Sequence, residues 1–166
     1  GTKQWGTNGV LISSASNDQS SPSISPDGAG GAVICWIDKR STTSSDVYAQ
    51  RVSAAGSLLW TNSGITAQGV PVTVAPGSQF GRLVGDGVGG AIVAWSDSAA
   101  GNYDIKSQRL SASTGLELWT PGGMSITSGN DYEALYDIVP DGLGGALVVW
   151  ANYTPHTMVG QRLDAS

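Results

Sequence analysis

Short apolar segments alternate with glycine-containing turns along the chain, and the three most apolar segments share one form. Residues 32–36 read AVICW, and the equivalent positions read AIVAW at 91–95 and ALVVW at 146–150. Successive apolar positions indicate a strand with both faces buried, whereas a strand with one wet face would alternate. The pattern therefore predicts three central strands, each in a sheet that is covered on both sides.

Weaker strand patterns flank each central segment. In the first unit they are PSIS at 22–25, DVYAQRVS at 46–53 and SLLW at 57–60. A glycine-rich turn at 27–31 joins the first strand to the central one, because glycine accepts a positive φ without strain. The small turn at 54–56 joins the last two strands. The order predicts an antiparallel meander of four strands.

The same unit is written three times. An Asp-Gly-x-Gly-Gly turn begins at Asp27, Asp86 and Asp141, and a tryptophan follows nine residues later at Trp36, Trp95 and Trp150. A Gln-Arg pair in the third strand ends at Arg51, Arg109 and Arg162. We interpret these residues as structural, with buried indoles, turn-forming aspartates and arginines that pair with them. Residues 1–166 form one repeat domain with units at 5–59, 60–118 and 119–166.

The motif PSISPDGxGGAxxxWxDxR…DxYxQR, most complete at 22–51, resembles repeats of β-propeller domains in secreted bacterial proteins. Its layout is similar to the blades of sialidase-type propellers. The resemblance implies an all-β fold of three four-stranded antiparallel blades, half of a six-bladed propeller, and a secreted or cell-surface location. The Asp38-x-Arg40 pair drifts to Asp97-x-Ala99 and Asn152-x-Thr154 in the later units. Three repeats also allow a closed threefold barrel, a β-trefoil or a β-prism.

Three blades would form an open arc, because propellers close with about four to eight blades. We expect each end to expose a blade face, with residues such as Ile34 or Val148, and an unpaired strand edge. Two partners could cover these ends. One is a second copy that closes a six-bladed homodimer, with residues 3–5 completing the partner's last blade beside 160–163. The other is a set of further blades in a longer parent chain.

Composition narrows the function. The net charge of −5 argues against nucleic-acid and anionic membrane partners, and no apolar run is long enough to span a bilayer. The single cysteine, Cys35, lies in an apolar segment, and the single histidine lies in another unit. Each glycine turn supplies one acid, which is too few for a calcium loop. We therefore expect no catalytic residue, metal or cofactor, and none of the sialidase catalytic residues can be placed.

Two sets of connections vary between the units: 13–21, 67–80 and 127–135 between units, and 39–45, 98–103 and 153–156 between the second and third strands. A four-stranded meander brings both sets to the same face, where binding sites usually lie. The candidate ligand-binding residues on this face are Asp18, Phe80, Tyr103, Asp131, Tyr132, Tyr153 and His156. Acids beside aromatic rings suit a glycan or a protein. The sequence therefore favours a non-catalytic binding or scaffolding module, and the alternative is a fragment of a sialidase-like glycan hydrolase.

Overall fold

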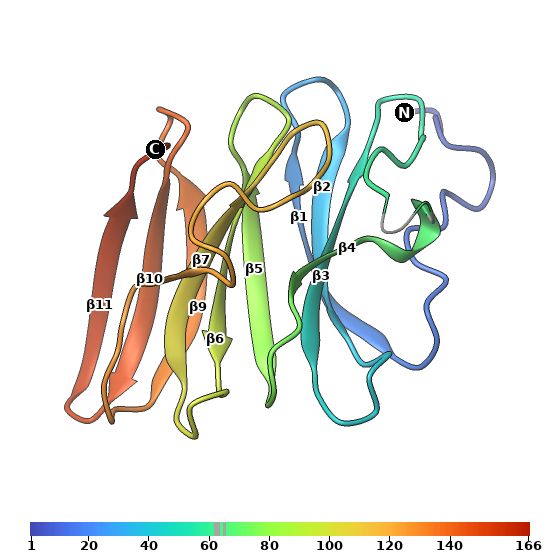
Figure 1. Ribbon diagram of the computed structural model, residues 1–166. Helices are drawn as coiled ribbons and strands as arrows, with labels where there is room; N and C mark the ends of the chain where they lie inside the picture. Colours follow the sequence, from blue (N-terminus) through green and yellow to red (C-terminus); the bar gives the residue numbers. More distant parts are fainter. Residues whose placement is uncertain (62–63, 65) are drawn as a thin grey trace.

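The computed structural model describes residues 1–61, 64 and 66–166, and it consists of antiparallel sheets in a row (Figure 1). The first sheet has the strand order β1-β2-β3-β4, the second β5-β6-β7-β8 and the third β11-β10-β9. The first sheet contains β1 (Gln19–Pro26), β2 (Ala32–Asp38), β3 (Asp46–Val52) and β4 (Val70–Thr73). The second contains β5 (Gln79–Gly85), β6 (Ala91–Asp97), β7 (Asp104–Leu110) and β8 (Met124–Ser125). The third contains β9 (Glu133–Pro140), β10 (Ala146–Tyr153) and β11 (His156–Leu163).

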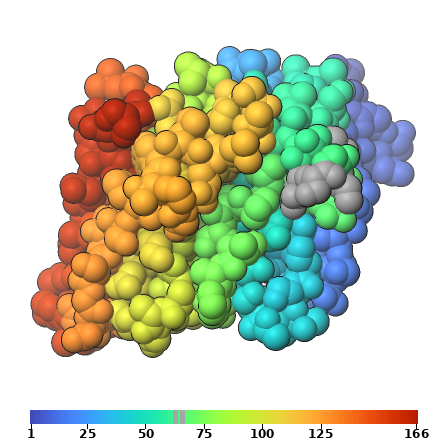
Figure 2. Space-filling view, viewed as in Figure 1, coloured from blue at the N-terminus to red at the C-terminus, as the bar shows by residue number. Residues whose placement is uncertain are grey.

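This architecture confirms the all-β prediction and the repeated sheet units. The sheets do not close into a barrel, so the threefold-barrel alternative is wrong. The chain ends lie at opposite ends of the row, as Figure 2 shows in blue and red. The 3-10 turn η1 (Thr66–Gln68) is the one helical element among the described residues, and none of their helices could cross a membrane.

The fourth strand differs from the prediction that placed it at residues 57–60. Leu58 forms only an isolated bridge to Val52, and the fourth strand is instead β4, where Thr73 pairs with Val47. The physical reason lies at Trp60, because the Gln50 side chain, rather than a neighbouring strand, binds the backbone of that residue. The third sheet has three strands instead of the four expected, and residues 3–5 form no strand in the single chain.

Two apolar cores lie between neighbouring sheets. Trp95 and Val33 belong to the core between the first and second sheets, and Trp150 belongs to the core between the second and third. Strands β2 and β6 are buried along their whole length, as predicted, whereas β10 alternates between buried and exposed positions. Only one face of β10 has a sheet packed against it.

Neither of the end-face residues named from the sequence, Ile34 and Val148, is exposed in the single chain. Val148 is buried against the second sheet, and the neighbouring Leu147 and Val149 are the exposed side chains. Ile34 is also buried, because Trp5 and the segment that follows it pack over the outer face of the first sheet. The error at Val148 arises because residues 146–150 are all apolar, so the letters do not show which side chains point to which face.

The Asp-Gly-x-Gly-Gly turns have one geometry in all three units. In the second unit Asp86 Oδ1 accepts hydrogen bonds from the amides of Val88 (3.0 Å) and Gly90 (2.8 Å). Asp27 and Asp141 accept the equivalent pairs of amide hydrogen bonds. Each aspartate also pairs with the arginine of its own unit at 2.6–3.0 Å. Each aspartate thus closes its own turn and connects it to the third strand of its unit through the arginine.

We expect Gly90→Ala to lower the free energy of unfolding by ~1–3 kcal/mol, the usual cost of overpacking. A Cβ at Gly90 would overlap the Leu110 carbonyl oxygen and lie 2.6 Å from Asp86 Oδ2. Gly160→Ala is the matched control, since its nearest neighbour, the Val148 oxygen, would lie 3.6 Å from the new Cβ. Urea unfolding measures both variants, and equal midpoints would show that the close approach at Gly90 has no energetic weight.

Candidate functional site: an aromatic ladder at the loop edge

Five aromatic side chains form a continuous series of contacts at the edge where the variable connections meet. We call this series the aromatic ladder, and its members in order are Phe80, Tyr103, Tyr132, Tyr153 and His156. Successive ring centroids are 6.1, 4.8, 5.1 and 6.5 Å apart. The last three contacts are edge-to-face, a geometry that aromatic pairs favour.

The ladder is held by backbone hydrogen bonds as well as by ring contacts. The Glu133 amide donates to the Tyr103 carbonyl (2.9 Å), and the Tyr153 amide donates to the Tyr132 carbonyl (3.0 Å). These bonds join the β6–β7 connection to the start of β9, and the start of β9 to the end of β10. The ladder therefore joins the second sheet to the third at the edge opposite the Asp-Gly turns (Figure 1).

Four of the five ladder rings, those of Phe80, Tyr132, Tyr153 and His156, are exposed to solvent, and Tyr103 is half-buried. Phe80, Tyr132 and Tyr153 are 44%, 47% and 46% exposed. Partial burial raises the pKa of Tyr132, and the neighbouring tyrosines Tyr103 and Tyr153 raise it further. Tyr153 and His156 also border a cavity of about 250 Å³ on the third sheet. Exposed rings in contact beside a hollow form a surface that can bind a ligand.

The two predicted acids lie differently from the rings. Asn102 Nδ2 donates to the Asp131 carbonyl (2.9 Å), which holds this residue one position before Tyr132. Asp18 directly precedes β1 of the first sheet, where its carbonyl accepts the Lys39 amide (2.9 Å) and it borders a hollow lined by serines and threonines. The structure thus places five of the seven candidates in the ladder, Asp131 next to it and Asp18 beside the first sheet.

Glu133 is a buried carboxyl that sequence reasoning missed. It directly follows Tyr132 and is only 5% exposed. Burial raises the pKa of Glu133, and the nearby Asp104 and Asp131 raise it further, while a hydrogen bond with Thr127 opposes the shift. The letters around Glu133 give no sign of this burial, because it depends on the packing of β9 against the second sheet.

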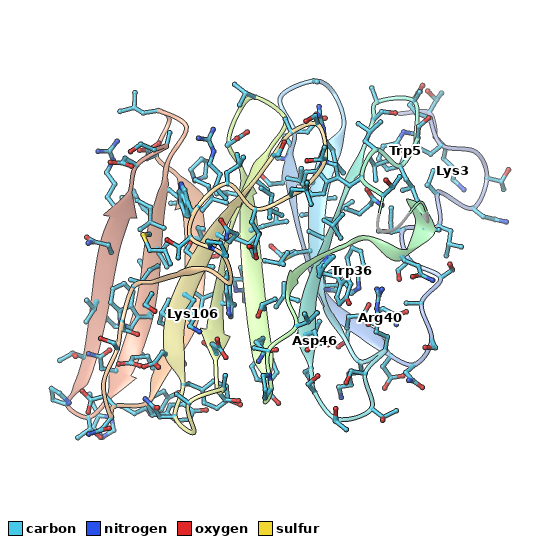
Figure 3. All side chains as sticks on the ribbon, viewed as in Figure 1. Lys3, Trp5, Trp36, Arg40, Asp46 and Lys106 are labelled. Atoms are coloured by element: carbon cyan, nitrogen blue, oxygen red, sulfur yellow. The ribbon has the colours of Figure 1, made fainter. Side chains whose placement is uncertain are left out.

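A second polar cluster lies on the first sheet and has a structural role. Arg40 Nη2 binds Asp38 Oδ2 at 2.7 Å, and the guanidinium lies 3.6 Å from the centroid of the Tyr48 ring. Burial alone would raise the pKa of Asp38, but hydrogen bonds from Arg40 and Trp36 hold it below its usual value. Figure 3 labels Trp36 and Arg40 on this sheet, and also Lys106, which pairs with Asp97 at 2.7 Å in the second sheet. The second unit has Ala99 where the first has Arg40, and Lys106 takes over the pairing with the aspartate.

The cysteine is structural in this fold. Cys35 is fully buried between the first two sheets, and burial raises the pKa of its thiol to about 12. The thiol is therefore protonated at neutral pH and is a poor nucleophile. Over residues 1–61, 64 and 66–166, no three His, Cys, Asp or Glu side chains are grouped to bind a metal ion.

Comparisons of this chain with protein families, curated proteins and solved structures find no match. The likeness to propeller blades therefore depends on the repeated motif and on the row of antiparallel sheets. The aromatic ladder has to be interpreted from its own geometry.

Proposed function

We propose that this chain is a non-catalytic binding module, built of β-propeller blades, that holds a glycan against the aromatic ladder. The observation that carries the proposal is the continuous contact between five rings at one loop edge. Monomeric proteins rarely leave such a group of large apolar side chains in water without a use for it. Loops on a rigid sheet scaffold commonly carry binding sites.

A sugar chain suits the chemistry of this edge. The C–H face of a pyranose can lie on an exposed ring, and its hydroxyl groups can bond to nearby amide and carboxylate groups. Tyr132 and Tyr153 supply such rings. The exposed Asp131, which precedes Tyr132 in the chain, and Asn152, which borders the same cavity as Tyr153, supply polar groups. Proline-rich peptides also bind grooves lined by aromatic residues, so a protein ligand is the alternative occupant.

Binding to a glycan array provides the test, with the whole chain as the probe. We expect Tyr132→Ala to weaken binding to the recognised glycan by about tenfold or more, as truncation of a central aromatic anchor does. Tyr132→Phe should keep most of the affinity, because it retains the ring. Val88→Ala is the control, since Val88 is also an exposed apolar side chain (72%) but lies in the Asp-Gly turn at the opposite edge.

Three results would count against the proposal. Glycan binding that is unchanged in Tyr132→Ala would place the site elsewhere. Binding to peptides but to no glycan would replace the proposed ligand class with a protein. Release of dye from chromogenic glycosides by the purified chain would contradict a non-catalytic role and favour the hydrolase alternative.

A further inference from the structure

Two sets of side-chain hydrogen bonds connect each unit to the next, and we call each set a lock. The first lock is made by a glutamine in the third strand. Gln50 Nε2 donates to the Trp60 carbonyl (3.0 Å), and the Trp60 amide donates to Gln50 Oε1 (2.9 Å). In the second sheet the Trp119 amide donates to Gln108 Oε1 (2.9 Å), and Gln108 Nε2 donates to the Thr120 carbonyl (2.9 Å). Each glutamine therefore fixes the chain at the tryptophan that leaves its sheet.

The arginine after each glutamine makes the second lock, which reaches the following sheet. Arg51 Nη1 donates to the Ala112 carbonyl (3.0 Å), and Arg109 Nη1 donates to the Ala165 carbonyl. Both acceptors follow the third strand of the next unit. The Trp60 indole donates to the same Ala112 oxygen (3.1 Å). That oxygen thus accepts hydrogen bonds from an arginine of the first sheet and from the tryptophan that Gln50 holds.

The first sheet has the backbone groups that these two locks use, but among the described residues no arginine or glutamine side chain binds them. The Trp5 indole donates to the Ala54 carbonyl (2.9 Å), as the Trp60 indole does to Ala112. No arginine reaches the Ala54 oxygen within the described part of the chain, and no glutamine side chain there holds the Trp5 amide. This end of the row can accept one more arginine and one more glutamine.

The third sheet carries the donating side chains of these locks. Arg162 pairs with Asp141 in its own turn, and its side chain is 51% exposed, against 15% for Arg51 and 19% for Arg109. Among the described residues, the only hydrogen bond of the Gln161 side chain is the one that its Oε1 accepts from the Arg162 amide. The donors that are missing at the first sheet are therefore present and exposed at the third.

The outer face of the third sheet is apolar in the same way as the buried face of the second. Its exposed members are Val139 (47%), Leu147 (42%), Val149 (37%) and Met158 (60%). The positions that correspond to them in the second unit are buried, and they are Val84 (5%), Ile92 (0%), Ala94 (0%) and Ile105 (0%). In the second sheet these positions pack against the next sheet, so the third sheet has a face shaped for another sheet.

The open strand edge of the third sheet matches a segment of the same chain. Strand β8 pairs with β7 at Lys106 and Ser107, while β11 lies at the edge of its sheet. Residues 10–11 stand as far from Trp5 as β8 stands from Trp119 in the sequence, and residues 159–160 correspond to Lys106 and Ser107. The segment after Trp5 is therefore a candidate fourth strand for a third sheet.

We propose that the outer face of the third sheet binds the first sheet of a second copy, over Trp5 and the segment that follows it, and that two such junctions form a closed dimer of six sheets. In each junction the Gln161 side chain of one copy forms hydrogen bonds with the backbone of the other copy at Trp5. The Arg162 side chain of the first copy donates to the Ala54 carbonyl of the other. A second copy is the occupant because the surplus donors and the vacant acceptors are the two halves of one repeated lock. A twofold axis then satisfies both junctions at once.

Light scattering of the whole chain at micromolar concentration tests the dimer. We expect the parent to have twice the chain mass of 16.9 kDa, and Leu147→Asp to have the mass of one chain. Leu147 is exposed in the single chain, so this variant should keep the parent's circular dichroism spectrum. Leu143→Asp is the matched control and should remain dimeric, because Leu143 is exposed in the Asp-Gly turn rather than on the outer face.

Arg162→Ala tests the lock itself and should raise the dissociation constant of the dimer at least tenfold. A parent chain with the mass of a monomer would overturn the proposal. A dimer that survives Leu147→Asp would also overturn it, because the interface would then lie elsewhere. A mass that grows with concentration beyond two chains would indicate an open head-to-tail array and would overturn the closed ring.

Discussion

Trp95→Ala is expected to lower the free energy of unfolding by ~3–5 kcal/mol, the range found when a large buried aromatic side chain is truncated. The Trp95 side chain is fully buried in the core between the first and second sheets. The far end of its ring fits so closely against Gly123 that a Cβ there would overlap it. The truncated side chain would therefore leave a cavity between the two sheets, which adds to the cost.

Chemical denaturation of the variant measures this loss, and Tyr132→Ala is the comparison. Tyr132 is about half exposed, so we expect its removal to change the free energy of unfolding little. The comparison uses one aromatic residue from the core and one from the ladder. A Trp95→Ala protein as stable as the parent, together with an unfolded Tyr132→Ala protein, would reverse this assignment of core and surface.

Asp86→Ala is expected to have an effect of similar size, ~3–5 kcal/mol, because it leaves the charge of Arg109 partly buried without its partner. Asp86 Oδ2 lies 3.0 Å from Arg109 Nη2, and the Asp86 carboxylate is 2% exposed. The other carboxylate oxygen accepts two amides of the turn, so the substitution also leaves these amides without an acceptor. Thermal and urea unfolding measure the loss.

A double-mutant cycle separates the two contributions at this site. Arg109→Met keeps most of the apolar stem and removes the charge, so Asp86→Ala with Arg109→Met should recover part of the stability lost in Asp86→Ala. The part that is not recovered reports the turn amides together with the Arg109–Ala165 hydrogen bond, which Arg109→Met also removes. If the double variant is no more stable than Asp86→Ala alone, the ion pair does not contribute and the turn accounts for the whole effect.

The repeated letters predicted the parts of the fold that are fixed by local chemistry. The Asp-Gly turns, the central strands that end at the second tryptophan of each unit, and the Gln-Arg strands lie where the sequence placed them. An aspartate that accepts two turn amides needs only its own neighbours, so its spacing is visible in one chain. Loop residues grouped by topology likewise met in the ladder, from Phe80 to His156.

The features that the sequence did not reveal depend on contacts between distant units. The apolar letters at 57–60 predict the fourth strand there, but Gln50 binds Trp60 and the chain joins the sheet again only at Val70. The burial of Glu133 and the exposure of Leu147 depend on which neighbour each sheet has. Such contacts cannot be read from neighbouring residues in the sequence, because the same apolar residues occur on a covered sheet face and on an exposed one.

The aromatic ladder also has a thermodynamic consequence. Phe80 and Tyr103 belong to the second sheet, whereas Tyr153 and His156 belong to the third, so a molecule bound along all five rings would touch both sheets. Its binding free energy would then include the packing between these sheets. By linkage, the ligand would raise the energy needed to pull the third sheet away from the second, and any change that loosens this contact would lower the affinity. The stability of the contact between the second and third sheets would thus increase with ligand concentration.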